Sequence, residues 1–275
     1  MRPPPRSSPP SSSRSSAHPW PRSSAGTDLA ALRTKAVRDG DDYVVDGQKI
    51  FTTGAHEADY IWLACRTDPE APRHRGISIL IVDTADPGFS WTPIITLDGA
   101  HHVNATYYSG VRVPVQMRVG AENEGWRLIT TQLNHERVML GPAGRIAALY
   151  DRVRAWAAMR SLLTQPDVRR ALARASAVMR VNELLNWQVA AAPAVQVADA
   201  SATKVFSSEQ LQVIGQSLAE VVGRHADPDP DTAALMTWLD IQLKRNLVLT
   251  FGGGVNEIQR ELIATAGLGL PRAPR

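Results

Sequence analysis

The chain has 275 residues, of which 44% are hydrophobic and 21% charged, so a globular core is expected over most of its length. Its longest apolar runs, such as residues 79–82, are far too short to span a bilayer, and a single cysteine excludes an internal disulfide and favours a reducing, cytoplasmic compartment. The formal charge of +3 reflects four arginines in an acid-free N-terminal tail; the remaining chain is close to neutral, which argues against nucleic-acid binding.

This tail, residues 1–25, consists mostly of Pro, Ser and Arg. Such a segment buries too little apolar surface to offset the entropy lost on ordering, so we expect it to be disordered. An Arg- and Ser-rich, acid-poor start also fits a targeting peptide, although its prolines disfavour a presequence helix. A mis-assigned or truncated start explains the same composition, and these interpretations stay open.

Residues from about 43 to 119 show the pattern of strands. β-Branched and aromatic residues gather in short runs separated by Pro, Gly and Asp, without a long helical segment between them. Asp46-Gly47, inside YVVDGQKIFTT, is the strongest short signal for a hairpin turn. We therefore expect residues 26–120 to form an antiparallel β-sandwich or barrel with Cys65 in its core.

After Gly120 the pattern becomes helical, and we expect helices near residues 123–160, 167–192, 199–224, 231–248 and 256–266. Asp167 follows a proline and is a candidate cap, and Asn256 with Gln259 resembles a capping box. Long helices with short links are typical of an antiparallel bundle. The expected fold class is α+β, with a β domain followed by an α-helical bundle domain over residues 121–275.

One acidic residue lies on an apolar helix face. At about 100° per residue, Glu136 falls on the centre line of the face formed by Ile129, Leu133, Leu140 and Ala147. A partly desolvated carboxylate at this place becomes a stronger base, which is typical of catalytic residues. The structural alternative is an ion pair with Arg137 or Arg145 at the edge of the apolar face.

Four stretches together resemble one family. Residues 25–36 (AGTDLAALRTKA), 46–60 (DGQKIFTTGAHEADY), 101–126 and 253–272 (GGVNEIQRELIATAGLGLPR) are similar to motifs of the acyl-CoA dehydrogenases, flavoproteins that desaturate acyl-CoA thioesters. HHVN and LNHERVMLGP are most similar to actinobacterial members that act on sterol side chains and other bulky acyl groups. The resemblance implies FAD as the cofactor, an acyl-CoA substrate and an electron-transferring flavoprotein as electron acceptor.

The same resemblance implies a catalytic base. Most members use a glutamate directly before the glycine of the GTNEIQR motif, but Gly253 stands there in this chain and has no side chain to accept a proton. Some members carry the base on another helix, inside an xxER sequence, and Glu136 in LNHERVML matches that place. Glu136 is thus the candidate base, and an inactive chain is the alternative.

Two segments of the first half match flavin contacts of the family. Phe51, Thr52 and Thr53 correspond to the hairpin beside the flavin, where an aromatic ring covers the isoalloxazine and a threonine hydroxyl reaches its polar edge. Thr27 corresponds to a turn that meets both the flavin and the acyl-CoA. In an ordinary β hairpin and turn the same residues need no ligand.

Further candidates lie in the helical half. Asn134 and Arg137 flank Glu136 where the family contacts its substrate, although a charged helix flank is often only solvated. The glycine-rich turn supplies backbone N–H groups for polar oxygens of the flavin or the thioester, at Gly254, Val255 and Asn256. The histidines have no spacing typical of a metal site.

The chain departs from the family pattern in three places. The tail stands where members have a helical N-terminal domain, RAWAAMRSLLTQPDVRR replaces the RxxFG segment, and LAEVVGRHADPD replaces the QxFGGxG segment that holds the diphosphate of the cofactor. The last two departures resemble heteromeric members, in which two subunit types share a flavin site, so we expect a homo- or hetero-oligomer. The first departure, a tail in place of the N-terminal helical domain, predicts exposed apolar surface.

Two alternative functions stay open. The chain could be a non-catalytic fragment or assembly subunit, or it could be an acyl-CoA oxidase.

Overall fold

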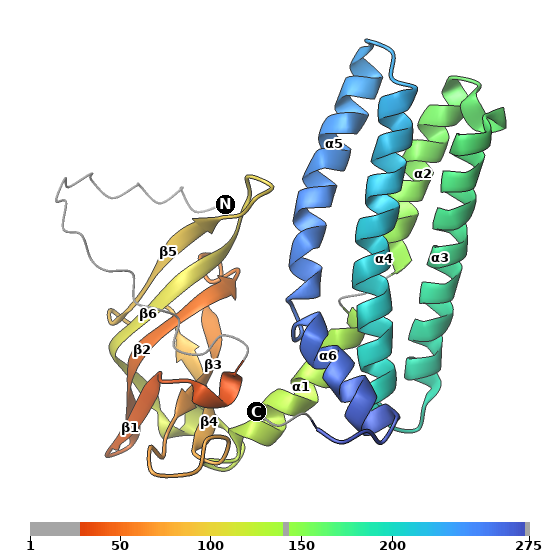
Figure 1. Ribbon diagram of the computed structural model, residues 1–275. Coiled ribbons are helices and arrows are strands. Elements are labelled where there is room, and N and C mark those ends of the chain that lie inside the picture. Colours follow the sequence, from red (N-terminus) through yellow and green to blue (C-terminus); the bar gives the residue numbers. More distant parts are fainter. Residues whose placement is uncertain (1–27, 140–142, 273–275) are drawn as a thin grey trace, which may run out of the picture.

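The computed structural model describes residues 28–139 and 143–272, and it describes the side chains of these residues except those of 134–139. The predicted disordered tail and Thr27 lie outside the described residues. Figure 1 shows a curled sheet, drawn in red to yellow, that one helix joins to a group of long helices, drawn in green to blue. This order confirms the predicted α+β class, with a β domain followed by a helical bundle.

Seven strands form one sheet in the order β5-β6-β2-β1-β3-β4-β7. Their pairs are antiparallel except β1 with β3, which run parallel where Lys35 meets Arg66. Short 3-10 turns at Leu29–Ala31 and Val115–Met117 flank the sheet. The strands are β1 (Lys35–Asp39), β2 (Asp42–Thr53), β3 (Tyr60–Arg66), β4 (Ile77–Asp83), β5 (Phe89–Ile95), β6 (His101–Pro114) and β7 (Arg118–Val119).

The sheet has a buried inner face, because alternate residues of its strands point to one side. Core residues of this face, at most 1% exposed, are Tyr43, Val45, Leu63, Leu80 and Val111. Cys65 lies in the same cluster, as predicted. Strand β4 is buried on both faces, since Ile77 and Ile79 pack outward against Ile129 of the helix that follows the sheet. A nearly continuous apolar strand is the result.

The predicted hairpin turn at Asp46-Gly47 is wrong. Strand β2 continues through these residues, and the hairpin turn lies earlier, between Asp39 and Asp42, with Gly40 at φ +62°. Gly47 instead sits at a bulge, where the register with β6 shifts. Its φ is +141°, and a Cβ there would lie 2.7 Å from the Cα of Thr34. The glycine therefore serves the close approach of a neighbouring segment.

The helices are α1 (Gly125–Met139), α2 (Ala143–Met159), α3 (Pro166–Ala191), α4 (Val197–Arg224), α5 (Pro230–Asn246) and α6 (Asn256–Leu262). Short 3-10 turns follow α2 and α5, at Leu162–Thr164 and Leu247–Thr250, and a π turn at Ile263–Gly267 follows α6. Helices α2 to α5 lie side by side in Figure 1, and α6 crosses α4 near one end of the bundle. Their core contains Leu149, Val153, Trp156, Ile214 and Leu218.

One prediction about helix capping is wrong. The helix expected at 123–160 corresponds to two described helices, Gly125–Met139 and Ala143–Met159, and the residues between them lie outside the described residues. Asn256 does not cap α6: the N-cap is Val255, which makes no side-chain cap bond. Asp167 lies one residue inside α3 and accepts hydrogen bonds from His225 as well as from the backbone of Val168.

Large apolar side chains remain exposed on the described surface, as the sequence predicts. On α3, Leu184 and Trp187 are 57% and 66% exposed, and Phe251 after α5 is 66% exposed. Among the described helices, none combines the length and the apolar content that a bilayer crossing requires.

Candidate active site

Phe51, near the end of β2, has a strained backbone. Its φ is +62°, in the left-handed region that costs a non-glycine residue on the order of 1 kcal/mol. The ring gains little packing in return, since the residue is 64% exposed. Strained residues of this kind cluster at ligand sites, where the strain presents a side chain to the ligand. The register with β6 shifts between Lys49 and Thr52, which gives the chain room for this conformation.

The two threonines after Phe51 differ in their surroundings. The Thr52 hydroxyl lies 3.2 Å from that of the buried Thr106 and thus points into the sheet core. Thr53 is exposed. Of the predicted flavin contacts on this strand, Phe51 and Thr53 are accessible to a ligand, whereas the Thr52 hydroxyl already has a partner.

A polar cluster behind this strand was not found by sequence reasoning. Asn104, which is fully buried, donates through Nδ2 to the backbone oxygen of Thr52 at 3.2 Å and to Nδ1 of His56 at 3.1 Å. Its Oδ1 accepts from Nε2 of His101 at 2.7 Å. The two imidazoles stack with ring centroids 4.0 Å apart, and Trp91 packs against both. The adjacent histidines of HHVN were the available signal.

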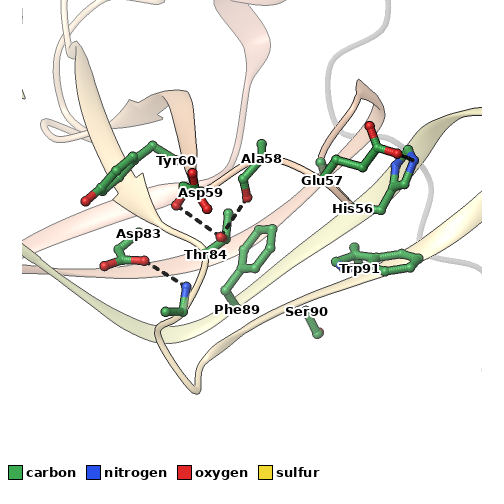
Figure 2. Close-up of a pocket in the computed structure, with 12 residues that line it drawn as sticks. His56, Glu57, Ala58, Asp59, Tyr60, Asp83, Thr84, Phe89, Ser90 and Trp91 are labelled. Atoms are coloured by element: carbon green, nitrogen blue, oxygen red, sulfur yellow. Dashed lines mark hydrogen bonds and ion pairs between the residues drawn. The ribbon is translucent and has the colours of Figure 1, made fainter. Parts of the chain in front are cut away.

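This cluster borders an open groove of about 830 Å³. Figure 2 shows His56 and Trp91 at one end of the groove, Tyr60 and Asp83 at the other, and Thr84 between them. The Thr84 hydroxyl donates to the backbone oxygen of Ala58 at 2.8 Å, which ties two loops together. Within the described part of the chain, no three His, Cys, Asp or Glu side chains are grouped to hold a metal ion.

Helix α1 links the sheet to the bundle. Ile129 is 6% exposed and packs against β4, and Leu133 joins the same cluster one turn later. Position 136 follows three residues after Leu133 and seven after Ile129, so it continues this face of the helix. The side chains of the three candidates on this helix, Asn134, Glu136 and Arg137, lie outside the described residues. Beside the preceding turns, Trp62 of β3 and Leu128 border a second hollow of about 580 Å³.

The glycine-rich turn before α6 is held from inside the bundle. Gly253 and Gly254 have φ values of +64° and +93°. The side-chain Nε2 of Gln259 lies 3.1 Å from the backbone oxygen of Gly253 and 3.3 Å from that of Gly254. Lys204, only 1% exposed, donates to the backbone oxygen of Gly254 at 2.9 Å. Sequence reasoning found the turn but missed the two side chains that hold it.

Asn256 differs from its predicted role. Its side chain is 3% exposed and faces the bundle interior, where Oδ1 lies 2.6 Å from Nζ of Lys204 and Nδ2 lies 2.9 Å from Oε1 of Glu209. Glu209 in turn pairs with Arg260 at 2.7 Å. The polar atoms of the Asn256 side chain are therefore engaged within the chain, and this segment offers a cofactor its backbone groups.

The predicted site residues come from three elements. Phe51 and Thr53 lie at the end of β2, position 136 near the end of α1, and Gly254 and Val255 in the turn before α6. In Figure 1, α1 runs from the sheet to the bundle, and α6 lies on the side of the bundle nearer to the sheet. An exposed aromatic ring, a threonine hydroxyl and backbone N–H groups fit the flat, polar-edged ring of a flavin.

Two family models match the chain. The model described as the acyl-CoA dehydrogenase middle domain matches residues 22–111, and that of the acyl-CoA dehydrogenase C-terminal domain matches residues 123–268. Among curated relatives, the acyl-CoA dehydrogenases FadE29 and FadE26 of Mycobacterium tuberculosis are 66% and 48% identical to this chain. Each match covers 91% of this chain and 67% of the relative.

Solved structures give the same result. The Tcur3481-Tcur3483 steroid ACAD is 51% identical with a TM-score of 0.83, over 90% of this chain and 66% of that one. The ChsE4-ChsE5 complex from Mycobacterium tuberculosis is 47% identical with a TM-score of 0.80, over 90% of this chain and 67% of that one. The chain thus spans about two thirds of the length of these relatives, and it belongs to the acyl-CoA dehydrogenase family.

Proposed function

We propose that the chain carries out flavin-dependent α,β-dehydrogenation of a bulky acyl-CoA thioester and supplies the catalytic base of a heteromeric enzyme. The observation that carries this proposal is that a glutamate is absent at one of the family's two positions for the base and present at the other. The place where most members of the family have a glutamate is Gly253, at φ +64°, which offers only its backbone. Position 136 instead continues the buried Ile129 face of α1 with a glutamate.

The base would act through its surroundings. A carboxylate on an apolar helix face is poorly solvated, so proton uptake from the substrate α-carbon is easier than in water. When bound, FAD supplies the acceptor for the β hydride. Phe51 and Thr53 would hold the flavin, the ring by covering it and the hydroxyl by a hydrogen bond at its polar edge, and backbone N–H groups of the glycine turn would receive the thioester carbonyl, whose oxygen gains negative charge during the reaction.

A second subunit would complete the cofactor site. LAEVVGRHADPD, at residues 218–229, ends α4 and leads into α5 where the family has its QxFGGxG segment. The exposed Leu184 and Trp187 on α3 offer apolar surface for contact with another chain. Two of the similar solved structures are named for two proteins together, Tcur3481-Tcur3483 and the ChsE4-ChsE5 complex.

The substrate class rests on likeness. The Tcur3481-Tcur3483 structure is described as a steroid ACAD, and the HHVN and LNHERVMLGP segments of this chain resemble sterol-type members. We therefore propose a steroid side-chain acyl-CoA as substrate, with a fatty acyl-CoA as the alternative, and an electron-transferring flavoprotein as the electron acceptor.

The test uses the chain co-expressed with a second subunit of the same family. The complex should be yellow, and anaerobic addition of a steroid side-chain acyl-CoA should bleach the flavin absorbance, while butyryl-CoA should do so poorly. Glu136→Gln should keep the yellow colour but slow bleaching about 10³-fold, the usual contribution of a general base. Glu124→Gln, an exposed change one residue before the same helix, is the control.

Two outcomes would contradict the proposal. Wild-type bleaching by the Glu136→Gln complex would remove the assignment of the base. A stable but colourless wild-type complex would favour the alternative, in which the chain serves only assembly.

A further inference from the structure

The strongest unexplained feature of the bundle is a buried ammonium group. Lys204, in the first half of α4, is 1% exposed. Its Nζ lies 3.2 Å from the backbone oxygen of Thr250, 2.9 Å from that of Gly254 and 2.6 Å from Oδ1 of Asn256. Burying an ammonium is costly unless acceptors surround it, so loss of any of these three hydrogen bonds would be unfavourable. The lysine thus fixes both ends of the glycine-rich turn.

Gln259 holds the same turn from the other side. Its Nε2 donates to the backbone oxygens of Gly253 and Gly254. A Cβ at position 254 would lie 2.5 Å from this nitrogen, so only glycine lets the amide approach so closely. Two consecutive carbonyl groups are therefore turned toward the bundle interior.

The direction of these carbonyls determines that of the following N–H groups. In a trans peptide the N–H points opposite to the C=O of the same unit. The N–H groups of Gly254 and Val255 therefore point away from Gln259 and Lys204. The N–H groups of Phe251 and Gly252 bind the backbone oxygen of Val248, whereas those of Gly254 and Val255 have no acceptor among the described residues. Two adjacent donors that face one way form a site for an oxygen atom with negative charge.

We infer that Lys204 and Gln259 are positioning residues, which hold the N–H groups of Gly254 and Val255 toward an oxygen atom of the bound thioester or of the flavin. The inference rests on the proposed function and adds two side chains to it. The buried positive charge behind the turn also strengthens the pull of these donors on a negative oxygen, since the interior screens it weakly. In both cases the ligand is an electron-rich oxygen atom. The binding experiment distinguishes the oxygen of the thioester from that of the flavin.

The variants are Lys204→Met, Lys204→Arg, Gln259→Leu and Gly254→Ala. The first removes the charge and its bonds, the second keeps a charge and donors, the third removes the amide, and the fourth displaces that amide without touching the lysine. Lys244→Met is the matched control, because Lys244 makes an ordinary helix-surface pair with Asp240 at 2.6 Å. All are made in the full chain within the complex.

The first measurement is hydrogen exchange of the protein without flavin. Lys204→Met and Gln259→Leu should each speed exchange at the Phe251 and Gly252 amides at least tenfold, whereas Lys244→Met should not. If Lys204→Met does not fold, Gln259→Leu and Gly254→Ala carry the test. Unchanged exchange in both of these would overturn the inference, whatever the activity of the enzyme.

The second measurement is binding. FAD affinity is taken from flavin fluorescence, and thioester affinity from the shift of the flavin spectrum with a non-reactive acyl-CoA thioether and the matching thioester. Loss of FAD affinity by tenfold or more identifies the flavin oxygen as the ligand, and a loss confined to the thioester identifies the thioester carbonyl. Lys204→Arg should recover part of the lost affinity. Wild-type affinity for both ligands in Gln259→Leu and Gly254→Ala would overturn the inference while the Glu136 result stood.

Discussion

The buried side-chain amide of Asn104, on β6, donates to the backbone oxygen of Thr52, 3.2 Å away on β2. This bond lies where the β2–β6 register shifts, between the strained Phe51 and the exposed Thr53. The same amide also holds His56 and His101. A single buried residue therefore fixes the backbone that presents both proposed flavin contacts.

Asn104→Ala should destabilise the fold and weaken FAD binding. The change leaves the buried Thr52 oxygen without its donor, which costs about 1–3 kcal/mol, and frees the strand on which Phe51 and Thr53 lie. Chemical denaturation of the flavin-free protein and FAD fluorescence measure the two effects. His102→Ala is the control, because His102 is half exposed and lies 3.8 Å from Asp98 outside this cluster. Equal FAD affinity in both variants would show that Asn104 does not contribute to FAD binding.

Phe51→Gly should make the flavin-free protein slightly more stable and yet bind FAD less well. Glycine tolerates φ +62°, so the change relieves about 1 kcal/mol of strain, and the 64% exposed residue has little packing to lose. The lost ring contact should lower FAD affinity about tenfold. Phe51→Ala keeps the strain and loses the ring, so it should leave the stability of the flavin-free protein nearly unchanged and lower FAD affinity as Phe51→Gly does. Undiminished FAD binding by Phe51→Gly would show that the ring does not touch the cofactor.

The order of the domains and the helices after α2 were predictable from sequence. The helices expected at 167–192 and 199–224 are Pro166–Ala191 and Val197–Arg224. Such long helices carry a repeated stripe of buried residues, which fixes their existence better than any single residue could. The strands were equally clear as a group, since β-formers alternate with turn residues throughout.

The errors arose where distant contacts decide the local structure. Asp46-Gly47 reads as a turn, but the space beside Thr34 makes Gly47 a bulge inside a long strand. Asn256 reads as a cap, but Lys204, more than fifty residues earlier in the chain, takes its side chain into the interior. Neither neighbour is visible in a short window of sequence.

Lys204 is a charged residue within a buried helical stripe that was not predicted from the sequence. It occupies the centre of a buried stripe of α4 formed by Ala200, Ser201, Ser207, Ser208 and Leu211. This arrangement is the one that drew attention to Glu136. The serines weaken the apolar character of the stripe, which hid the charged residue within it. A helical stripe of small polar residues can therefore be buried, and a charged residue within it is a candidate for a structural or functional role, as in an aliphatic stripe.

Lys49 should make stability depend on pH above neutrality. Burial, which disfavours the charged ammonium, lowers the pKa of Lys49 from 10.5 to about 8. The unfolded chain thus binds the proton more tightly, so this lysine lowers stability below pH 8 and the penalty disappears as the pH rises toward 10.5. Lys49→Met should therefore stabilise the protein at pH 7, by about 3 kcal/mol at most.

Denaturation of both proteins between pH 7 and 10.5 tests this expectation. The stability advantage of Lys49→Met should shrink steadily above pH 8. Lys35→Met is the control, because Lys35 is exposed and its pair with Asp46 spans 3.9 Å. An advantage that stays constant over this pH range would show that the Lys49 ammonium remains solvated in the folded protein.

Gly47→Ala should cost far more stability than Gly40→Ala. At position 47 the new Cβ would lie 2.7 Å from the Cα of Thr34, on a backbone at φ +141°, so strain and overpacking together cost about 2–5 kcal/mol. At position 40 nothing lies within 4 Å and φ is +62°, so only the local strain of about 1 kcal/mol remains. Denaturant unfolding of the two variants measures the difference. Similar losses in both would mean that β1 and β2 can part near Thr34 without disturbing the sheet, in which the pairing of β2 with β6 would then suffice to hold the strand that leads to Phe51.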